Sequence, residues 1–155
     1  MQELPYRNCV TMFVKKNGKI FSGERSDVIG AWQLPQGGIE KGESILEAAK
    51  RELREETGIV SVKFLKQTAA PMRYDFSPEL QDKCLKKYGN LKYAGQQVTF
   101  VLFDFFGDDS EIDLEATSPR EFSNWKWIEP KILLDGIVDF KKEVSISAAK
   151  ELGLI

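Results

Sequence analysis

The stretch "GGIEKGESILEAAKRELREETGI", from Gly37 to Ile59, decides the fold, because it specifies both ends of a helix. Ser44 and Glu47 match a capping box, in which each side chain bonds to a free backbone N–H of the other, so we expect the helix to begin at about Ile45. Gly58 fits the left-handed residue that commonly ends a helix. The stretch therefore predicts a loop, a helix and a second loop.

The apolar side chains of this predicted helix define the face that packs. With a step of about 100° per residue, one arc of the helix carries Ile45, Leu46, Ala49 and Leu53. The opposite arc carries Glu47, Lys50 and Arg54. We expect the first arc to pack against a sheet and the second to face solvent.

Three glutamates, Glu52, Glu55 and Glu56, flank or overlap the apolar arc, at the border between core and water. Like charges one turn apart cost a few tenths of a kcal/mol when exposed, and partial burial raises that cost unless a positive charge lies among them. A divalent cation is one solution, since magnesium and manganese prefer oxygen ligands. Arg51 can also neutralise or orient one acid. The alternative is a surface helix whose acids are balanced by its own basic side chains.

The composition limits the chemistry that the chain can use. Its 155 residues, 42% of them hydrophobic and 30% charged, predict one globular domain over residues 1–155. There is no histidine, which excludes Ser-His-Asp and Cys-His catalysis and histidine-ligated zinc. A net charge of -2 gives no broad basic field for non-specific nucleic-acid binding. Carboxylates and a hard cation remain as the tools of a hydrolase.

Cysteine usage and hydropathy predict a cytoplasmic protein. The two cysteines, Cys9 and Cys84, form neither a metal-type spacing nor a disulfide framework, which indicates a reducing compartment. No apolar run is long enough to cross a bilayer, and the start "MQELPYRN" lacks the apolar region of a signal peptide. We therefore expect no membrane contact and infer no obligatory protein partner.

Segments on both sides of the acidic helix have the patterns of strands. "CVTMFVKKNGKIFSGER" predicts a β-hairpin around Asn17 and Gly18. "VSVKFL", "QVTFVLFDFFG" and "SNWKWIEP" predict further strands, with an irregular polar section from Pro71 to Gly95. A closing helix is expected from Lys141 to Leu152. This order predicts an α/β fold with a mixed sheet between helices.

The opening stretch also matches a known motif at every fixed position. The motif is the Nudix box, G-x5-E-x7-R-E-U-x-E-E-x-G-U, and residues 37–59 meet it with Gly37, Glu43, Arg51, Glu52, Leu53, Glu55, Glu56, Gly58 and Ile59. The chain thus resembles the Nudix hydrolase superfamily. That resemblance implies an α/β/α sandwich with a loop-helix-loop catalytic motif, and hydrolysis of a nucleoside diphosphate linked to another group.

The resemblance extends along nearly the whole chain to one bacterial branch, the RNA pyrophosphohydrolases and dinucleoside polyphosphate hydrolases. "YRNCVTMFVKKNGKIFSGER", "AWQLPQGGI", "YAGQQVTFVLF", "SPREFSNWKWI" and "DFKKEV" each resemble a segment of that branch. One strand expected near the substrate departs from it, because the branch usually reads "GQKQKWF" where residues 95–100 read "GQQVTF". The departure bears on substrate preference and not on the metal chemistry.

The resemblance also implies that Mg²⁺ or Mn²⁺ is the cofactor. Carried over by motif position, Glu52, Glu55 and Glu56 are the metal ligands, helped by a backbone carbonyl near the glycine pair, at Gly38. Glu121 matches an acid that approaches the metal from another loop, so it is a candidate ligand or general base. Glu52 is the other candidate base, and the alternative for Glu121 is an exposed loop acid. The candidate catalytic residues are Arg51, Glu52, Glu55 and Glu121.

The matched segments supply candidate contacts to the substrate as well. Arg7, Arg25 and Lys141 are candidates for phosphate or base contacts, since arginine can hold a phosphate with two parallel hydrogen bonds or stack on a base. Phe140 can offer an opposing stacking face. The alternatives are a solvated surface charge for each cation and core packing for Phe140. Two glutamines complete the candidate set, Gln36 and Gln96.

Several functions fit these residues. The first is an RNA pyrophosphohydrolase, which removes pyrophosphate from 5′-triphosphate RNA and leaves a 5′ monophosphate. The second is asymmetric cleavage of a dinucleoside polyphosphate such as diadenosine tetraphosphate, and a nucleotide-pool sanitising enzyme is a third. The alternative from another class is a Nudix-fold binding module without catalysis, against which the intact box argues.

Overall fold

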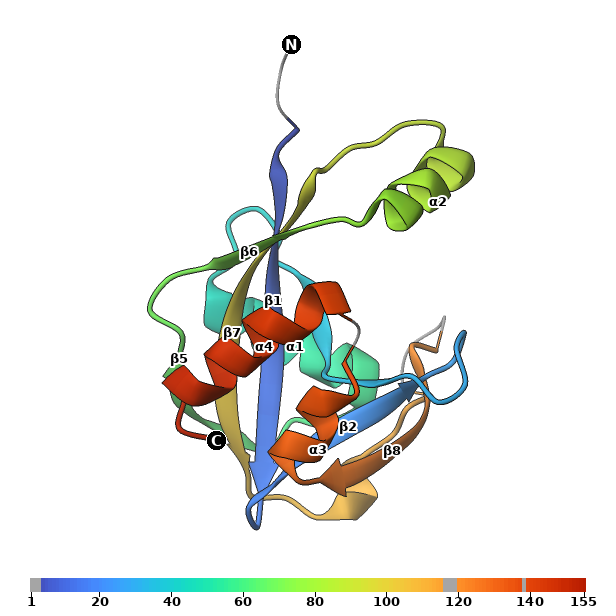
Figure 1. The fold of residues 1–155 in the computed structure, drawn as a ribbon. Helices are drawn as coiled ribbons and strands as arrows, with labels where there is room; N and C mark the ends of the chain where they lie inside the picture. The colour runs from blue at the N-terminus through green and yellow to red at the C-terminus, as the bar shows by residue number, and fades with distance from the viewer. Residues whose placement is uncertain (1–3, 116–119, 138) are drawn as a thin grey trace.

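The described part of the chain, residues 4–115, 120–137 and 139–155 of a computed structural model, alternates strands and helices (Figure 1). The elements are β1 (Tyr6–Lys16), β2 (Lys19–Arg25), β3 (Trp32–Gln33), β4 (Gln36–Gly38), α1 (Ile45–Thr57), β5 (Val62–Gln67), β6 (Met72–Asp75), α2 (Pro78–Tyr88), β7 (Gly95–Phe105), the 3₁₀-helix η1 (Asp109–Glu111), β8 (Phe122–Ile128), α3 (Pro130–Asp135) and α4 (Asp139–Glu151). The side chains of residues 139 and 140 lie outside this description. None of the described helices combines the length and the apolar composition needed to cross a bilayer.

Strands β1 and β7 form the centre of the sheet and run parallel, in register from Tyr6 opposite Gly95 to Lys15 opposite Asp104. The path through the sheet is β3-β2-β1-β7-β5, and the other pairings are antiparallel. At its far end β1 pairs with β2, whereas nearer its start it pairs with β4. The hairpin strands therefore diverge, and this divergence places β4 beside the first residues of β1. The predicted mixed sheet is confirmed.

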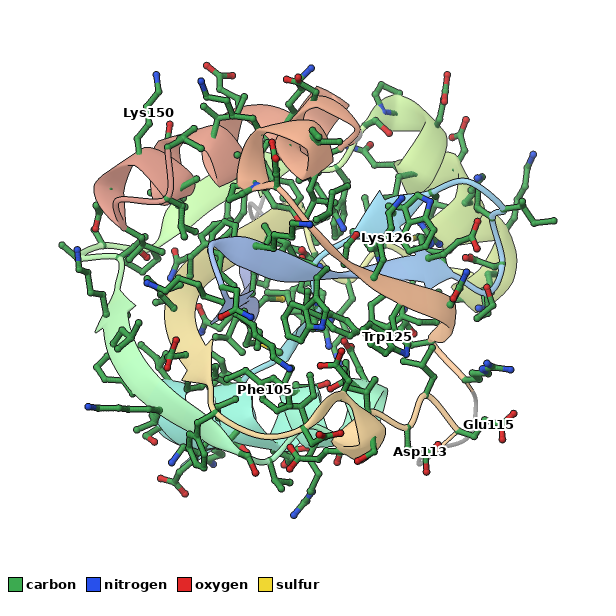
Figure 2. The ribbon with its side chains drawn as sticks, turned by 90° about the horizontal axis from the view of Figure 1, so that it is seen from below. Phe105, Asp113, Glu115, Trp125, Lys126 and Lys150 are labelled. Atoms are coloured by element: carbon green, nitrogen blue, oxygen red, sulfur yellow. The ribbon has the colours of Figure 1, made fainter. Side chains whose placement is uncertain are left out.

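Alternate side chains of the central strands enter two different cores. From β1, Cys9 and Phe13 pack with α3 and α4, whereas Val10 and Met12 pack with α1. All four side chains are fully buried. Seen from below, α1 and α4 lie on opposite sides of the sheet (Figure 2). The predicted α/β/α sandwich is therefore confirmed.

Helix α1 begins and ends where the sequence predicts. The backbone N–H of Glu47 donates to Oγ of Ser44 at 3.1 Å, the return bond of the capping box is present, and Gly58 has a φ of 77°. In the predicted apolar arc, Ala49 and Leu53 are fully buried and the other two residues pack against the same core. The predicted solvated arc is exposed at all three of its positions, Glu47, Lys50 and Arg54.

The expectation of an irregular section between Pro71 and Gly95 is wrong. That section contains β6, which pairs with β7, and the helix α2. Ser77 caps α2 by accepting a hydrogen bond from the N–H of Leu80 at 3.2 Å, and Gly89 ends it with a φ of 77°. The polar composition of this section gave no apolar period from which a helix could be predicted, although residues that cap a helix are present at both ends. A further helix, α3, begins at Pro130, where the sequence predicted only the end of a strand.

Candidate active site

Two glycines let β4 lie directly against the side chains of the site. A Cβ atom on Gly37 would overlap the carboxyl group of Glu52, and a Cβ atom on Gly38 would lie 2.5 Å from Nη2 of Arg7. Both glycines pair with β1, opposite Val10 and Cys9. The glycine pair therefore permits a close approach between the strand, the helix carboxylate and the arginine that a larger residue would prevent.

Arg51 holds the acids of the box together. Its Nε and Nη2 donate to the two carboxylate oxygens of Glu43, at 2.7 and 2.9 Å. Its Nη1 donates to Glu52 at 2.8 Å and to Glu55 at 3.3 Å, and its Nη2 also donates to the carbonyl oxygen of Gly38 at 2.9 Å. These bonds lower the pKa of Glu43 to about 2 and raise that of Arg51. One guanidinium thus links the loop before α1, the helix and β4.

Glu56 is a partly buried acid that lies near two other acids. Burial, with smaller contributions from the negative charges of Glu121 and Glu52, raises its pKa to about 9. The backbone N–H of Gln36 donates to Oε2 of Glu56 at 3.2 Å and fixes its orientation. Burial also raises the pKa of Glu52. In this environment the negative charge of a carboxylate has little positive charge near it, so a bound cation would stabilise the charged form.

The donor atoms at this position fit a divalent metal ion. Within residues 4–115, 120–137 and 139–155, no three acidic side chains already share one metal-ligating arrangement. Arg51 draws Glu52 and Glu55 toward itself, because a guanidinium is the nearest compensating charge. Carboxylate oxygens together with the carbonyl oxygen of Gly38 are nevertheless the ligands that Mg²⁺ and Mn²⁺ prefer. The ligand assignment stays a prediction that these residues support.

A polar cavity of about 210 Å³ brings together six of the candidate residues. Its walls include the cations Arg7, Arg25 and Lys141, from β1, β2 and α4, and the acids Glu56 and Glu121. Glu121 precedes β8, and its carbonyl oxygen accepts a hydrogen bond from the N–H of residue 26 at 3.1 Å. Burial, with Arg25 nearby, lowers the pKa of Lys141. An anion in this cavity would meet positive charge from three separate elements.

A second polar cavity, of about 290 Å³, lies on the other side of Arg7. It is lined by Tyr6, Arg7, Asn8, Gly38, Ile39, Glu40, Glu52 and Tyr93. A smaller, more apolar pocket under α4 shares Arg25, Gln36 and Lys141 with the first cavity and includes Trp32 and Phe100. Most of the candidate substrate contacts and acids therefore border three cavities around β4 that share lining residues.

The two candidate glutamines have different positions. Gln36 lines the first cavity, whereas Gln96 is only 9% exposed and lies outside all the cavities described above. Its Oε1 accepts hydrogen bonds from Nε2 of Gln36, at 2.7 Å, and from the hydroxyl group of Tyr74. Gln96 therefore supports Gln36 from behind.

Sequence reasoning missed Tyr74, which belongs to the section expected to be irregular, and no motif marks it. The side chain of Phe140 lies outside the described residues.

Known proteins with similar sequences support the interpretation of this site. The NUDIX domain family matches residues 5–147. The chain is 43% identical over 155 residues to a protein of Erythrobacter litoralis named RNA pyrophosphohydrolase, with 97% of this chain and 92% of that protein covered. It is 44% identical over 145 residues to a protein of the same name from Dinoroseobacter shibae, with coverage of 91% and 88%.

Among solved structures, the E. coli dihydroneopterin triphosphate pyrophosphohydrolase is similar with a TM-score of 0.67 at 15% identity, covering 92% of this chain and 95% of that one. A similarity at so low an identity shows the fold alone. The family match, in contrast, spans most of the chain and includes the complete box. The chain therefore belongs to the Nudix hydrolase family.

Proposed function

We propose that this Nudix hydrolase is an RNA pyrophosphohydrolase, which cleaves the 5′-triphosphate end of RNA, releases pyrophosphate and leaves a 5′ monophosphate. The observation that carries the proposal is the cavity where Arg7, Arg25 and Lys141 face Glu56 and Glu121. Three cations suit a triphosphate, and a partly buried acid, Glu56, beside the exposed Glu121 suits a divalent cation. The names of the relatives at 43% and 44% identity support this choice of substrate.

The three cations bind the triphosphate in this proposal. Arg25 is oriented by Asp27, whose carboxylate accepts from its Nε at 2.8 Å, so its guanidinium needs little further ordering when a phosphate arrives. Lys141 is partly buried near Arg25, and an anionic phosphate would favour its charged form. Phosphoryl transfer depends mainly on such positioning and charge neutralisation.

The glutamates of α1 hold the divalent cation, Mg²⁺ or Mn²⁺. Glu52, Glu55 and Glu56 supply carboxylate oxygens, and the Gly38 carbonyl and Glu121 are the remaining candidate ligands. When bound there, the ion would neutralise phosphate charge and lower the pKa of the attacking water. The residues around it keep the acids in place, since Arg51 bonds to Glu52 and Glu55 and the N–H of residue 36 bonds to Glu56.

A carboxylate must also accept the proton of the attacking water. Glu52 and Glu121 border the two polar cavities, and either can fill this role. The pH–rate profile of Glu121→Gln distinguishes them. If Glu52 is the base, the rise of the rate with pH at the acidic side of the profile is still seen in this variant. If Glu121 is the base, that rise is lost.

The proposed substrate can be tested against its nearest rival. Purified protein with Mg²⁺ is incubated separately with 5′-triphosphorylated RNA and with diadenosine tetraphosphate, and kcat/KM is compared. We expect the larger kcat/KM for RNA, with pyrophosphate and 5′-monophosphate RNA as products. A strong preference for the dinucleotide would assign the chain to asymmetric dinucleoside polyphosphate hydrolysis. Saturable RNA binding without turnover of either substrate would indicate a binding module.

A further inference from the structure

Helix α2 is unusual because it buries no side chain, although it has 11 residues and is fully capped. It stands away from the sandwich, beyond β6 (Figure 1). A helix of this length is marginal in water without tertiary packing. Leu85 and Tyr88 are 45% and 66% exposed, so α2 presents apolar and aromatic surface to solvent rather than to the core. These features suit an element that contacts a ligand.

The charge of α2 and of the segment after it differs from the charge of the whole chain. Residues 78–93 contain four lysines and two acids, whereas the whole chain has a net charge of -2. Lys83, Lys86 and Lys87 are three and four residues apart, so they share one face of the helix. All three are exposed. The result is a local basic face on an otherwise slightly acidic protein.

An electrostatic interaction links this basic face with the loop that follows β2. The pKa of Asp27 is lowered mainly by hydrogen bonds from Arg25, and the positive charge of Lys83 adds to the effect. Lys83 is therefore within electrostatic range of the loop that follows Arg25, and Arg25 itself lines the first cavity. The α2 helix also extends from the edge of the sheet where Asp75 pairs with Gly95.

The second cavity connects the site with the segment that follows α2. Tyr93 and Tyr6 line this cavity together with Glu52. Tyr6 also donates a hydrogen bond to Asp75, and the guanidinium of Arg73 lies 4.8 Å from the centre of its ring. The aromatic rings of Tyr6 and Tyr93 and the cation of Arg73 thus lie between the acids of the candidate site and α2. Single-stranded nucleic acid is bound by this combination, in which bases stack on rings and cations contact the phosphates.

We propose that the basic face of α2, formed by Lys83, Lys86 and Lys87 together with Tyr88, binds the part of an RNA substrate that lies downstream of its 5′ end. The proposal rests on the proposed function and deepens it, because it makes substrate length a determinant of affinity. A substrate of one or two nucleotides would fill the cavities around β4 without contacting α2. A longer RNA would gain phosphate contacts and base stacking on the helix.

The test compares substrates of two lengths in matched variants. Lys86→Ala/Lys87→Ala removes two charges from α2, and Lys131→Ala/Lys150→Ala removes two exposed charges from α3 and α4 (Lys150 is labelled in Figure 2). Each protein is assayed with Mg²⁺ on an unstructured triphosphorylated RNA of about ten nucleotides, within the usual site size, and on a triphosphorylated dinucleotide. Circular dichroism verifies that each variant is folded.

We expect the α2 variant to raise KM for the longer RNA about fivefold, with kcat and the dinucleotide kinetics unchanged, because single lysine–phosphate contacts affect binding and not chemistry. For binding of 5′-hydroxyl RNA of the same length, measured by fluorescence anisotropy, the slope of log Kd against log salt should fall by about 1.4, since each contact to a single strand contributes about 0.7. Tyr88→Ala should weaken the same binding through lost stacking.

Other outcomes overturn the proposal in distinguishable ways. Equal kinetics of the α2 variant and the wild type on the longer RNA would exclude this surface while leaving the proposed function intact. Equal losses on both lengths would indicate a disturbed active site, and equal losses in the α3 and α4 variant would indicate a general charge effect. A wild-type protein that hydrolyses neither RNA and fails to bind the 5′-hydroxyl RNA would remove the proposed function and this inference together.

Discussion

At the scale of single residues, Glu56 is the most strongly perturbed acid of the site. Its pKa of about 9 arises mainly from burial, and the charges of Glu121 and Glu52 raise it further. In protein without metal, Glu56 therefore holds its proton at neutral pH, and binding of a cation would release that proton. A partly buried carboxyl group without a compensating cation lowers the stability of the fold, and a metal ion beside Glu56 would supply that compensation.

This environment predicts how the stability of metal-free protein depends on pH. The folded-state pKa of Glu56, about 9, lies above its ordinary value of 4.5, so folded protein binds the extra proton between these values and loses stability as pH rises. The neutral variant Glu56→Gln lacks this loss. In EDTA, the free energy of unfolding of Glu56→Gln relative to the wild type should rise by about 1.4 kcal/mol per pH unit between pH 4.5 and about 9.

The measurement is chemical denaturation of both proteins in EDTA at pH 5 and pH 8. The variant Glu47→Gln, at an exposed position in the first turn of α1, preserves the capping box; it is the control and should show no such growth. A stability difference between Glu56→Gln and wild type that stays constant between the two pH values would contradict the assigned burial of Glu56.

Arg51 offers a second test at the same scale. Lysine keeps the charge but cannot form the paired hydrogen bonds to Glu43 and also reach Glu52 and Glu55. We expect Arg51→Lys to lower kcat/KM on triphosphorylated RNA about 100-fold, as a misplaced catalytic group does. Arg54→Lys, at an exposed position three residues away, should leave kcat/KM within about twofold. Equal activity of the two variants would remove the positioning role of Arg51.

From the sequence alone, the residues of the box could be selected as candidates, whereas the residues that support them from behind could not. Glu52, Glu55 and Glu56 could be selected because their spacing on one helix is a local property. Gln96 could not be distinguished from a substrate contact, because its burial depends on Tyr74, which is 22 residues away in the chain. Contacts of that kind depend on strand pairing, which short motifs do not encode.

At the scale of elements, the approach of β4 to α1 is the feature on which the site depends. A methyl group on Gly37 would overlap the carboxyl group of Glu52. Gly37→Ala should therefore displace Glu52 and lower kcat/KM about 100-fold, as a displacement near 1 Å does. Gly136→Ala is the matched control, since its new Cβ atom would lie 3.6 Å from the nearest atom, the carbonyl oxygen of Leu133.

The measurement is steady-state kinetics on triphosphorylated RNA, with a thermal melt of each variant. Wild-type activity in a folded Gly37→Ala protein would show that β4 and α1 need not be so close. Loss of activity in Gly136→Ala as well would indicate a general intolerance to alanine and would remove the support for a specific contact.

Elements with strong local signals could be predicted, and those without them could not. The hairpin of β1 and β2 follows from Asn17 and Gly18, which both have positive φ as a tight turn requires. Helix α2 was missed because it has no buried face and therefore lacks a clear apolar period. Its capping residues, Ser77 and Gly89, were present in the sequence and are the signals that could have found it.

At the scale of the whole molecule, the site exists only because distant segments meet around β4. The first cavity receives side chains from β1, β2, α1, α4 and the residue before β8. Each strand pairing contributes to this convergence, and the parallel pairing of β1 with β7 joins segments about 90 residues apart. The sequence could indicate each segment by resemblance, but their convergence in one cavity follows from the packed fold.

The proposed activity of the whole molecule depends on a divalent cation among the glutamates of α1. The most direct measurement is anomalous diffraction from crystals soaked in Mn²⁺, collected for wild type and for Glu56→Gln. We predict an anomalous peak beside Glu52, Glu55 and Glu56 in the wild type, and its loss or strong reduction in the variant. A wild-type map without a peak there, in which Arg51 still bonds to Glu52 and Glu55, would contradict the account.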